Sequence, residues 1–402
     1  MKLLQKIQAL SREYHEDVVF FRRHFHALPE LSKEEHKTAA FIATRLRELG
    51  ISVQEGIAGT GLLALIEGRD ASSAVIALRA DMDALPIHEE NRVEYKSTIP
   101  GVMHACGHDV HMASLLGTAK ILHVLRDQWQ GTVKLIFQPS EERYPGGASQ
   151  MINEGVLENP RPAAIFGQHV FPALPAGKIG IRGGRYMAST DEVYITVKGK
   201  GGHAAKPHLN VDPIVIASHI VVALQQIVSR NASPHIPTVL SFGRIIGDGQ
   251  MNIIPDEVKI DGTFRTFSEE WRQKAHLRIR ETAVFIAQGM GGDCDVVIEP
   301  GYPFLENDPK LVENFRTFAA EYVGSENIEE LELSMTAEDF AHFAQHVSAC
   351  FYRLGTSNIK TGITSGLHTS EFDVDEKSLE TGIGLMAWVA IRELESLIKA
   401  RA

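Results

Sequence analysis

The chain of 402 residues is too long for one ordinary hydrophobic core and predicts about two domains, for which its 44% hydrophobic content is ample. Its formal net charge of −11, without a block of lysine or arginine, argues against binding to nucleic acid or to an anionic membrane surface. The three cysteines are odd in number and far apart, which favours reduced thiols over a disulfide framework.

Neither the apolar runs nor the N-terminal segment predicts insertion into a membrane. The longest apolar runs, such as residues 211–222, are interrupted by polar residues and are too short to span a bilayer. The N-terminal segment is amphipathic and lacks the apolar core and small-residue cleavage site of a signal peptide. We therefore expect a cytoplasmic protein that has no membrane partner.

The first half of the chain predicts alternating helices and strands. Apolar residues recur at helical spacing over residues 3–26, and a second helix is expected over residues 32–49. Residues 74–78 are uniformly apolar, which is typical of a strand buried on both faces. Further expected elements are strands at 52–55, 62–66, 132–137 and 163–166 and a helix at 112–125. This alternation predicts an α/β fold whose mostly parallel mixed sheet carries helices on both faces.

The pattern changes after Gly184 and predicts a second domain. Its expected elements follow the order β-α-β-β-α-β, at residues 191–198, 213–229, 238–246, 258–267, 269–288 and 295–299. That order is the split arrangement of a ferredoxin-like sandwich. We expect this domain, residues 187–298, to be inserted into the first.

The first domain is then expected to resume, so that it comprises residues 1–186 and 299–402. Helices are expected over residues 335–345 and 376–399, with a strand over 349–354 between them. The strand needs a sheet partner, which the first domain supplies.

Side chains that bind metals gather in loops and after predicted strands. The stretch 103–111 holds three imidazoles, a thiol and a carboxylate, and a single glycine between Cys106 and His108 lets both face one point. Each candidate alone has a structural reading, since an aspartate after a strand often caps a turn and a glutamate pair is usually solvated. Together they predict a metal site at the carboxyl ends of the strands. The candidates are Asp81, Asp83, Cys106, His108, Glu141, Glu142, His169 and His368.

Motifs along nearly the whole chain resemble one family of enzymes. They are residues 25–32, 79–86, 103–111, 137–142, 167–169, 199–208, 252–256, 262–265, 338–340 and 366–368. These segments are similar to those of the dinuclear metal-dependent amidohydrolases, which include aminoacylases, hippurate hydrolase, auxin-conjugate hydrolases and N-acetyl-diaminopimelate deacetylase. The resemblance implies a zinc-peptidase-like catalytic domain and an inserted domain that acts as a lid and in dimerisation. The residues after His368 differ from the commoner pattern of this branch, which bears on substrate choice.

The resemblance also implies a set of metal ligands. Two divalent ions are expected, of zinc, manganese, nickel or cobalt, with a bridging thiolate from Cys106. Asp81 stands where distant relatives have a metal-binding histidine, and its role stays open. The implied ligands are Cys106, His108, Glu142, His169 and His368.

Further roles are carried over from the same resemblance. Glu141 is expected to be the general base, and Asp83 to be the carboxylate that orients a ligand. His203 is expected to donate a hydrogen bond to the developing oxyanion, either across a dimer interface or on domain closure. Asn252 and Arg265 are expected to hold the substrate. An internal ion pair is an equally valid reading of Arg265.

The implied activity is hydrolysis of the amide bond of N-acyl-L-amino acids or related small conjugates. One alternative is a dinuclear metallo-dipeptidase or exopeptidase, and another is a metal-binding protein without catalysis. A binder has no use for Glu141, which argues against the latter. An exposed edge strand of the inserted domain, paired with its copy, predicts a homodimer.

Overall fold

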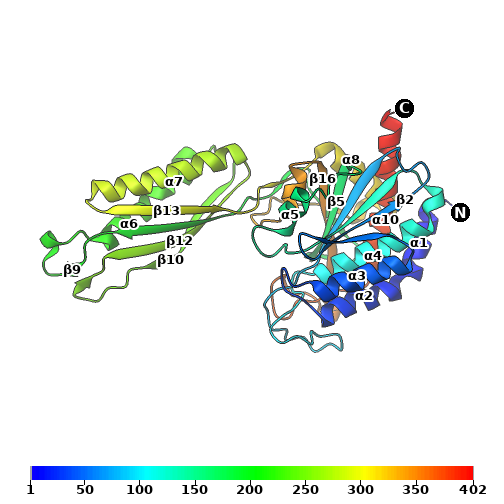
Figure 1. The fold of residues 1–402 in the computed structure, drawn as a ribbon, viewed down its shortest axis with the longest axis horizontal. Coiled ribbons are helices and arrows are strands. Elements are labelled where there is room, and N and C mark those ends of the chain that lie inside the picture. The colour runs from blue at the N-terminus through cyan, green and yellow to red at the C-terminus, as the bar shows by residue number, and fades with distance from the viewer. Residues whose placement is uncertain (1, 402) are drawn as a thin grey trace. The chain divides into compact units, whose positions relative to one another are not determined.

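The computed structural model describes residues 2–401, whose contacts form two compact units (Figure 1). The first unit comprises the described residues up to Gly184, Glu306–Glu332 and the described residues from Asp339 onward. The second unit comprises Arg185–Leu305 and Leu333–Glu338. The chain passes between the units within β7 (Gly184–Met187) and again within β14 (Leu305–Asn307).

An eight-stranded mixed sheet forms the centre of the first unit. Its four central strands are parallel, while β1 and β2 pair antiparallel at one edge and β6 runs antiparallel to β16. The expected mostly parallel mixed sheet is thereby confirmed. In spatial order the strands are β1 (Val53–Ile57), β2 (Gly61–Glu67), β4 (Thr132–Gln138), β3 (Val75–Asp81), β5 (Ala164–Pro175), β16 (Ser348–Ser357), β6 (Ile179–Ile181) and β15 (Ile328–Glu330).

Helices cover both faces of this sheet. Alternate strand residues, such as Val133, Leu135 and Phe137 of β4, enter one large hydrophobic cluster with six helices. Lys134 points to the opposite face, where its ammonium donates to the carbonyl groups of Val156 and Glu158. That second face carries α5 (Gly147–Asn153) and α9 (Ala341–Ala344). The six helices of the large cluster are α1 (Leu3–Glu13), α2 (His15–Ala27), α3 (His36–Glu48), α4 (His108–Val124), α8 (Pro309–Val323) and α10 (Ser378–Arg401).

Two predicted helices have different bounds in the structure. The single helix expected over residues 3–26 is divided at Tyr14 (φ −89°, ψ 0°), which is the C-cap of α1 and the N-cap of α2. The helix expected over residues 335–345 was wrong except at α9. Residues 335–340 are irregular instead, with a bend at Thr336, because the backbone of Ser334 hydrogen bonds with Tyr186 and Ala188 and the N–H of Ala188 also donates to the carbonyl of Thr336. Tertiary pairing thus overrides local helical preference there.

Two other elements extend further than the sequence indicates, and both changes concern the site. Helix α4 begins at His108, not at residue 112, because Gly107 adopts φ +79° and ends the preceding loop. Strand β5 runs through His169, which was expected to lie beyond the strand.

The second unit has the expected β-α-β-β-α-β order, and its antiparallel sheet has the strand order β10-β12-β8-β13. Val193, Ile195 and Val197 of β8 face the two helices, and the residues between them face away from the core. A short ribbon is formed by β9 (Gly202–His203) and β11 (Ile253–Ile254). The main elements are β8 (Asp191–Lys198), α6 (Pro213–Gln226), β10 (Thr238–Ile246), β12 (Glu257–Thr266), α7 (Glu269–Gly289) and β13 (Asp293–Pro300).

One described helical segment, Pro213–Asn231, is long and apolar enough to cross a membrane when judged by length and composition alone. The segment has 19 residues and a mean hydropathy of 1.4, so it is longer than the run 211–222 considered from the sequence, and polar residues such as Ser218, His219 and Gln225 interrupt it. Its buried residues Ile216, Ile220 and Leu224 belong to the core of the second unit. The apolar composition is thus also that of a helix packed on a sheet.

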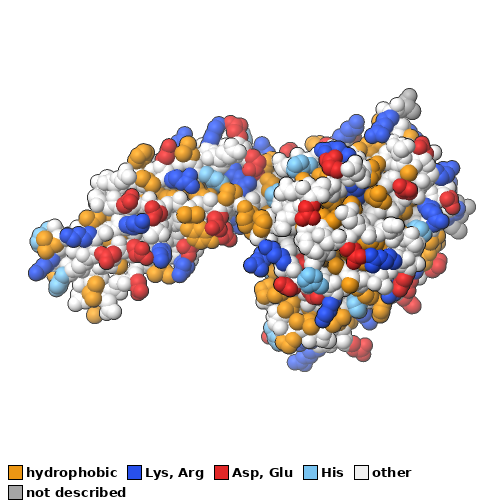
Figure 2. Space-filling model, in the orientation of Figure 1, with side chains coloured by type: hydrophobic (Ala, Val, Ile, Leu, Met, Phe, Trp, Pro, Cys, Tyr) orange, Lys and Arg blue, Asp and Glu red, His pale blue; other side chains and the backbone are white. Residues whose placement is uncertain are grey.

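Charged side chains are mixed on the surface that Figure 2 shows. On that face of each unit, lysine and arginine side chains alternate with aspartate and glutamate and form no continuous basic patch.

A buried ionic network fixes the start of α4 to α2. The Arg22 guanidinium, which is fully buried, donates to Asp109 at 2.8 Å and to Asp373 at 2.7 Å. The His26 ring lies 2.8 Å from the same Asp109 carboxylate and 3.1 Å from Glu89. Because Asp109 follows His108 directly, this network also fixes the position of His108.

We expect Asp109→Ala to lower the free energy of unfolding by about 3 kcal/mol, because it leaves the buried Arg22 charge short of a partner. Urea denaturation of metal-free protein measures the change. Lys274→Ala is the matched control, since it breaks an exposed ion pair with Glu270 and is expected to leave the urea midpoint unchanged. Equal midpoints for the two variants would contradict the role of the network.

Candidate metal centre

The loop before α4 presents Cys106 and His108 to the same point. Gly107 between them has φ +79°, and a side chain there would place its Cβ 2.4 Å from the Val170 side chain. Only glycine therefore permits both the left-handed backbone and the close approach to β5. The backbone N–H of His368 donates to the carbonyl of Ala105, which brings the late His368 segment to this loop.

Five predicted ligands lie together in the first unit. Cys106, His108 and His169 form one group whose possible ligand atoms lie within 4.8 Å of one another. Cys106, Glu142 and His368 form a second group by the same measure. The Cys106 sulfur lies 3.5 Å from His169 Nε2 and 3.3 Å from His368 Nε2. Two groups of three ligand atoms therefore share one thiol.

A hydrogen bond of His169 and an ion-pair contact of His108, each made through Nδ1, leave the Nε2 atoms of both rings available for a cation. His169 Nδ1 donates to the carbonyl of Val170 at 2.7 Å, so its Nε2 carries no proton in the neutral ring. His108 Nδ1 lies 3.4 Å from Asp83 Oδ1 and directs Nε2 toward Glu142, 3.8 Å away. Neither ring nitrogen of His108 nor Glu142 Oε1 has a hydrogen-bond partner among the described residues. Buried donor atoms of this kind fit a bound metal ion.

His368 adopts a backbone conformation that is unusual for its residue type. Its φ is +60°, in the left-handed region, and its Nε2 lies 3.4 Å from Glu142 Oε1. Its side chain is about half exposed, unlike the other predicted ligands. Backbone strain of this kind occurs at sites where a precise side-chain position matters.

Two of the predicted ligands, Cys106 and His108, have raised pKa values. Burial, followed by the negative charges of Glu142 and Glu141, raises the pKa of the Cys106 thiol well above its usual value. Burial lowers the pKa of His108, but the charges of Asp81 and Asp83 outweigh it and raise the pKa to about 10. Both groups are therefore protonated at neutral pH until a cation displaces their protons.

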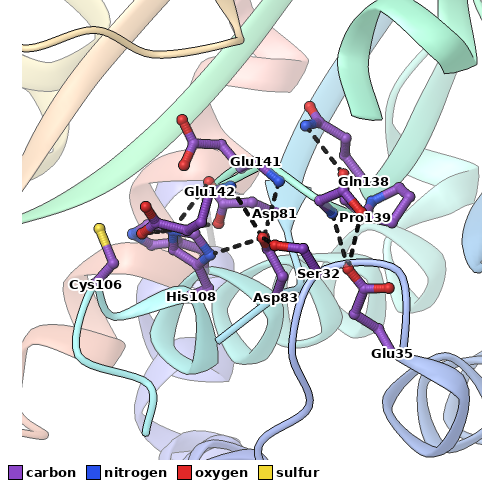
Figure 3. A network of polar contacts seen from close by, with 12 residues as sticks. Ser32, Glu35, Asp81, Asp83, Cys106, His108, Gln138, Pro139, Glu141 and Glu142 are labelled. Atoms are coloured by element: carbon purple, nitrogen blue, oxygen red, sulfur yellow. Dashed lines mark hydrogen bonds and ion pairs between the residues drawn. The ribbon is translucent and has the colours of Figure 1, made fainter. Parts of the chain in front are cut away.

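Asp83 holds the loop that carries the two glutamates (Figure 3). Its Oδ1 accepts the N–H of Glu141 at 3.0 Å, and its Oδ2 accepts the N–H of Glu142 at 2.9 Å. The Ser32 hydroxyl also donates to Oδ2 at 2.6 Å. The expected contact of Asp83 with a ligand ring is present at His108, and the backbone contacts add a second task that the sequence did not indicate.

Asp81, whose role stayed open, is fully engaged by neighbouring side chains. It accepts from Arg79 at 2.6 Å and lies 2.5 Å from His111 Nδ1. The N–H of Val170 donates to His111 Nε2, so the proton of the neutral His111 ring is on Nδ1 and is donated to Asp81. This geometry favours a supporting role for Asp81 over ligation.

Asp339 lies in one of the motifs that carry the resemblance, residues 338–340, but the sequence indicates no role for it. Its buried carboxylate accepts from Arg79 at 2.8 Å, from Gln138 at 2.7 and 2.8 Å, and from the N–H of Ala148 at 3.0 Å. Its own N–H donates to Glu141 Oε1 at 3.3 Å. The side chain therefore joins the ends of β3 and β4 to the loop of the predicted base.

The remaining predicted residues belong to the second unit. His203 and Asn252 lie together, since the N–H of Ala204 donates to the carbonyl of Asn252 beside the β9–β11 ribbon. Arg265 lies elsewhere, on β12, and its guanidinium donates to the carbonyl of Phe264 and the hydroxyl of Thr263. Among the described residues no carboxylate forms an ion pair with Arg265, so the alternative of an internal ion pair is not supported.

Comparison with known proteins places this arrangement in a family. A family model described as peptidase family M20/M25/M40 matches residues 77–392. The chain belongs to this family. It is 42% identical over 376 residues to a Bacillus subtilis (strain 168) protein whose name assigns it provisionally to the amidohydrolases, with 94% of each chain covered. It is 38% identical over 388 residues to N-acetylcysteine deacetylase of the same organism, covering 96% of this chain and 99% of the relative.

A solved structure of another M20 protein has the same fold. The crystal structure of a Bacillus subtilis protein described as a dinuclear metal binding peptidase aligns with a TM-score of 0.83 and 35% identity. The alignment covers 96% of this chain and 99% of that one. The family and the fold class expected from the sequence are therefore confirmed.

We expect metal loading at pH 7 to release roughly one to two protons per chain, because Cys106 and His108 must lose their protons to ligate. Metal affinity should accordingly rise with pH. Titration calorimetry in buffers of different ionisation enthalpy measures the release. Cys106→Ser should reduce it, whereas Cys294→Ser, a change in the second unit, should not. A release that is the same for all three proteins would exclude Cys106 as a thiolate ligand.

Proposed function

We propose that this M20 protein hydrolyses the amide bond of N-acyl-L-amino acids or related small amide conjugates. The observation that carries the proposal is the pair of ligand groups that share Cys106, beside Glu141, which belongs to neither of these two groups but lies close to His108 and Glu142. The names of relatives support the substrate class, since they include an N-acetylcysteine deacetylase and an IAA-amino acid hydrolase.

The predicted ligand set fits two divalent cations. The shared thiol, three imidazoles and one carboxylate suit zinc, manganese, nickel or cobalt, and the solved M20 relative is described as dinuclear. Bound there, such ions supply Lewis acidity, which polarises the amide carbonyl and lowers the pKa of an attacking water molecule. Proton transfer and stabilisation of the oxyanion are assigned to side chains of the protein.

Glu141 is the proposed general base. Its carboxylate lies within 4.8 Å of ligand atoms of His108 and Glu142, and the N–H of Asp339 donates to it. Glu141 takes a proton from the attacking water and passes it to the leaving amine. The backbone contacts of Asp83 keep Glu141 facing the centre.

His203 is the proposed donor to the oxyanion that develops on the carbonyl. The N–H of Ala205 donates to its Nδ1 at 3.1 Å, so the proton of the neutral ring is on Nε2. Nε2 is therefore a hydrogen-bond donor on an exposed side chain. A charge-assisted or neutral bond from this atom stabilises the negative oxygen before the amine leaves.

The spacing of His203 and Arg265 in the second unit supports a proposal in which two protein chains hold one substrate. Glu257, at the start of β12, lies near the ribbon of His203, and Arg265 follows eight residues further along the strand. At about 3.3 Å per residue that separation is about 26 Å. An N-acyl amino acid has the length of a dipeptide, about 7 Å. His203 and Arg265 of one chain therefore cannot both grip it, and we propose that His203 acts on a substrate bound by the partner of a homodimer.

The second unit offers a surface for this dimer. β10 is an edge strand of its sheet, and Ile245 and Ile246 on it are exposed. Val222 on α6 is 74% exposed. Antiparallel pairing of β10 with its copy would cover the free edge and these apolar side chains.

A dinuclear dipeptidase or exopeptidase is the alternative reading, and the family name and the solved relative both use the word peptidase. Such an enzyme must recognise a free α-amine, for which the sequence offers no dedicated acidic pair. A panel of blocked and unblocked substrates separates the two activities.

We expect chelator-stripped protein reloaded with zinc or manganese to release amine from N-acetyl or N-benzoyl amino acids. Glu141→Ala should lose turnover by about 10⁴-fold while still binding two ions, because it removes only the base. Glu158→Ala, an exposed carboxylate, is the matched control. Ion content is measured by mass spectrometry. Turnover that survives Glu141→Ala with ions bound would refute the mechanism, and release from dipeptides alone would favour the peptidase.

We expect mixed dimers of two inactive variants to recover activity. A chain with His203→Ala keeps its own Glu141 and can accept His203 from a Glu141→Ala partner. Equal random mixing makes about half of the dimers mixed, and one of the two sites in each mixed dimer is complete. The mixture should therefore recover about a quarter of wild-type turnover. Sedimentation of the same mixture checks that dimers form. Val222→Glu should abolish both the dimer and the recovery, whereas Leu277→Glu on α7 should affect neither. A mixture of dimers that stays inactive would show that His203 acts within its own chain.

A further inference from the structure

Three consecutive backbone N–H groups of the glutamate loop point at buried carboxylates. Asp83 accepts those of Glu141 and Glu142, and Glu35 Oε1 accepts that of Ser140 at 2.8 Å (Figure 3). Successive N–H groups next to a left-handed residue form a concave site for an anion. Here that site is filled by two side chains of the protein itself.

Ser140 needs such a partner because of its backbone. Its φ of +55° lies in the left-handed region, which costs a residue with a Cβ free energy unless the surroundings hold it. A backbone hydrogen bond joins the two ends of this loop, since the N–H of Gly147 donates to the carbonyl of Ser140. The conformation of Ser140 decides how Glu141 and Glu142 leave the end of β4, so a change there would turn both carboxylates.

Glu35 is placed for this contact and not for the helix that follows it. It is the N-cap residue of α3, yet its side chain makes no capping hydrogen bond. The neighbouring Glu30 does so instead, accepting the N–H groups of Lys37 and Thr38 at 3.2 and 2.8 Å. Glu35 is fully buried, and its second oxygen accepts from the Thr60 hydroxyl at 2.7 Å. One oxygen thus accepts from Ser140, and the contact of the other with Thr60 fixes the orientation of the carboxylate.

We propose that Glu35 is a positioning residue that holds Ser140 in its left-handed conformation and thereby sets the directions of the base Glu141 and the ligand Glu142. The inference rests on the proposed function for its effect on turnover. Its structural part, the immobility of residues 138–147, does not depend on the substrate. Glu35 itself touches no reacting atom.

The test compares Glu35→Ala with Glu35→Gln and with Glu30→Ala. Glu35→Ala should lower kcat about 100-fold with little change in KM, because displacement of a base by about 1 Å has that effect. Glu35→Gln keeps an acceptor for Ser140 and a donor for the Thr60 hydroxyl, so it should restore kcat to within about threefold of wild type. Glu30→Ala is the matched control, since it removes the cap of α3 and should lower Tm without changing kcat.

A second readout needs no activity. Hydrogen exchange measured by mass spectrometry should become faster in residues 138–147 of Glu35→Ala and remain as in wild type in Glu30→Ala. Ser140→Gly added to Glu35→Ala should slow that exchange again and recover about tenfold in kcat, because glycine adopts the left-handed region without the cost of a Cβ. Should Glu35→Ala fail to fold, Glu35→Asp, which is too short to reach both Ser140 and Thr60, should show the same faster exchange.

The outcomes separate this inference from the proposed function. Unchanged exchange in residues 138–147 for folded Glu35→Ala or Glu35→Asp would overturn the positioning role. A loss of kcat that simply follows Tm in Glu35→Ala and Glu30→Ala alike would also overturn it. If wild-type protein released no amine from any substrate of the panel, the proposed function would fall, and the exchange experiment would still decide the role of Glu35.

Discussion

The candidate metal centre depends on one constraint, which is that each buried negative charge must be compensated by hydrogen-bond donors or positive charges. Asp81, Asp83 and Asp339 lie almost fully buried within one region, and Glu141 is nearly as buried. An isolated carboxylate in such surroundings would be too costly to keep ionised. Each aspartate is therefore met by backbone N–H groups, an arginine or a ring nitrogen. The donor atoms left over, on Cys106, His108, His169, Glu142 and His368, are those that a cation would satisfy.

This compensation links the fold to the chemistry. The carboxyl ends of β3 and β4 place Asp81 and Gln138 side by side, because the two strands pair in parallel with that register. Asp83, after the end of β3, then holds the loop after β4, and Asp339 contacts both strands from a distant segment. Rigid strands fix the anchors and hydrogen bonds fix the loops, so the site needs no flexible element within the first unit to bring its ligands together.

Much of this could be predicted from the sequence, for physical reasons that also set the limit. A buried parallel strand that runs straight into Glu141 and Glu142 is an unusual pattern, and Cys106 and His108 are neighbours in a loop, so local sequence indicates these ligands. Glu35 and Asp339 give no such signal, since their partners lie 105 and up to 260 residues away. The helix expected over residues 335–345 failed for the same reason, because pairing with Tyr186 and Ala188 decides its backbone.

The distance along the chain between Cys106 and His368 has a consequence for biosynthesis. Their contact spans 262 residues, and one of the two strands that pair with β5 is β16, which is synthesised late. A nascent chain that already exposes Cys106, His108 and His169 to the cell therefore holds one half of a soft-metal site before its other half exists. The ribosome must release almost the entire chain before the thiol is enclosed.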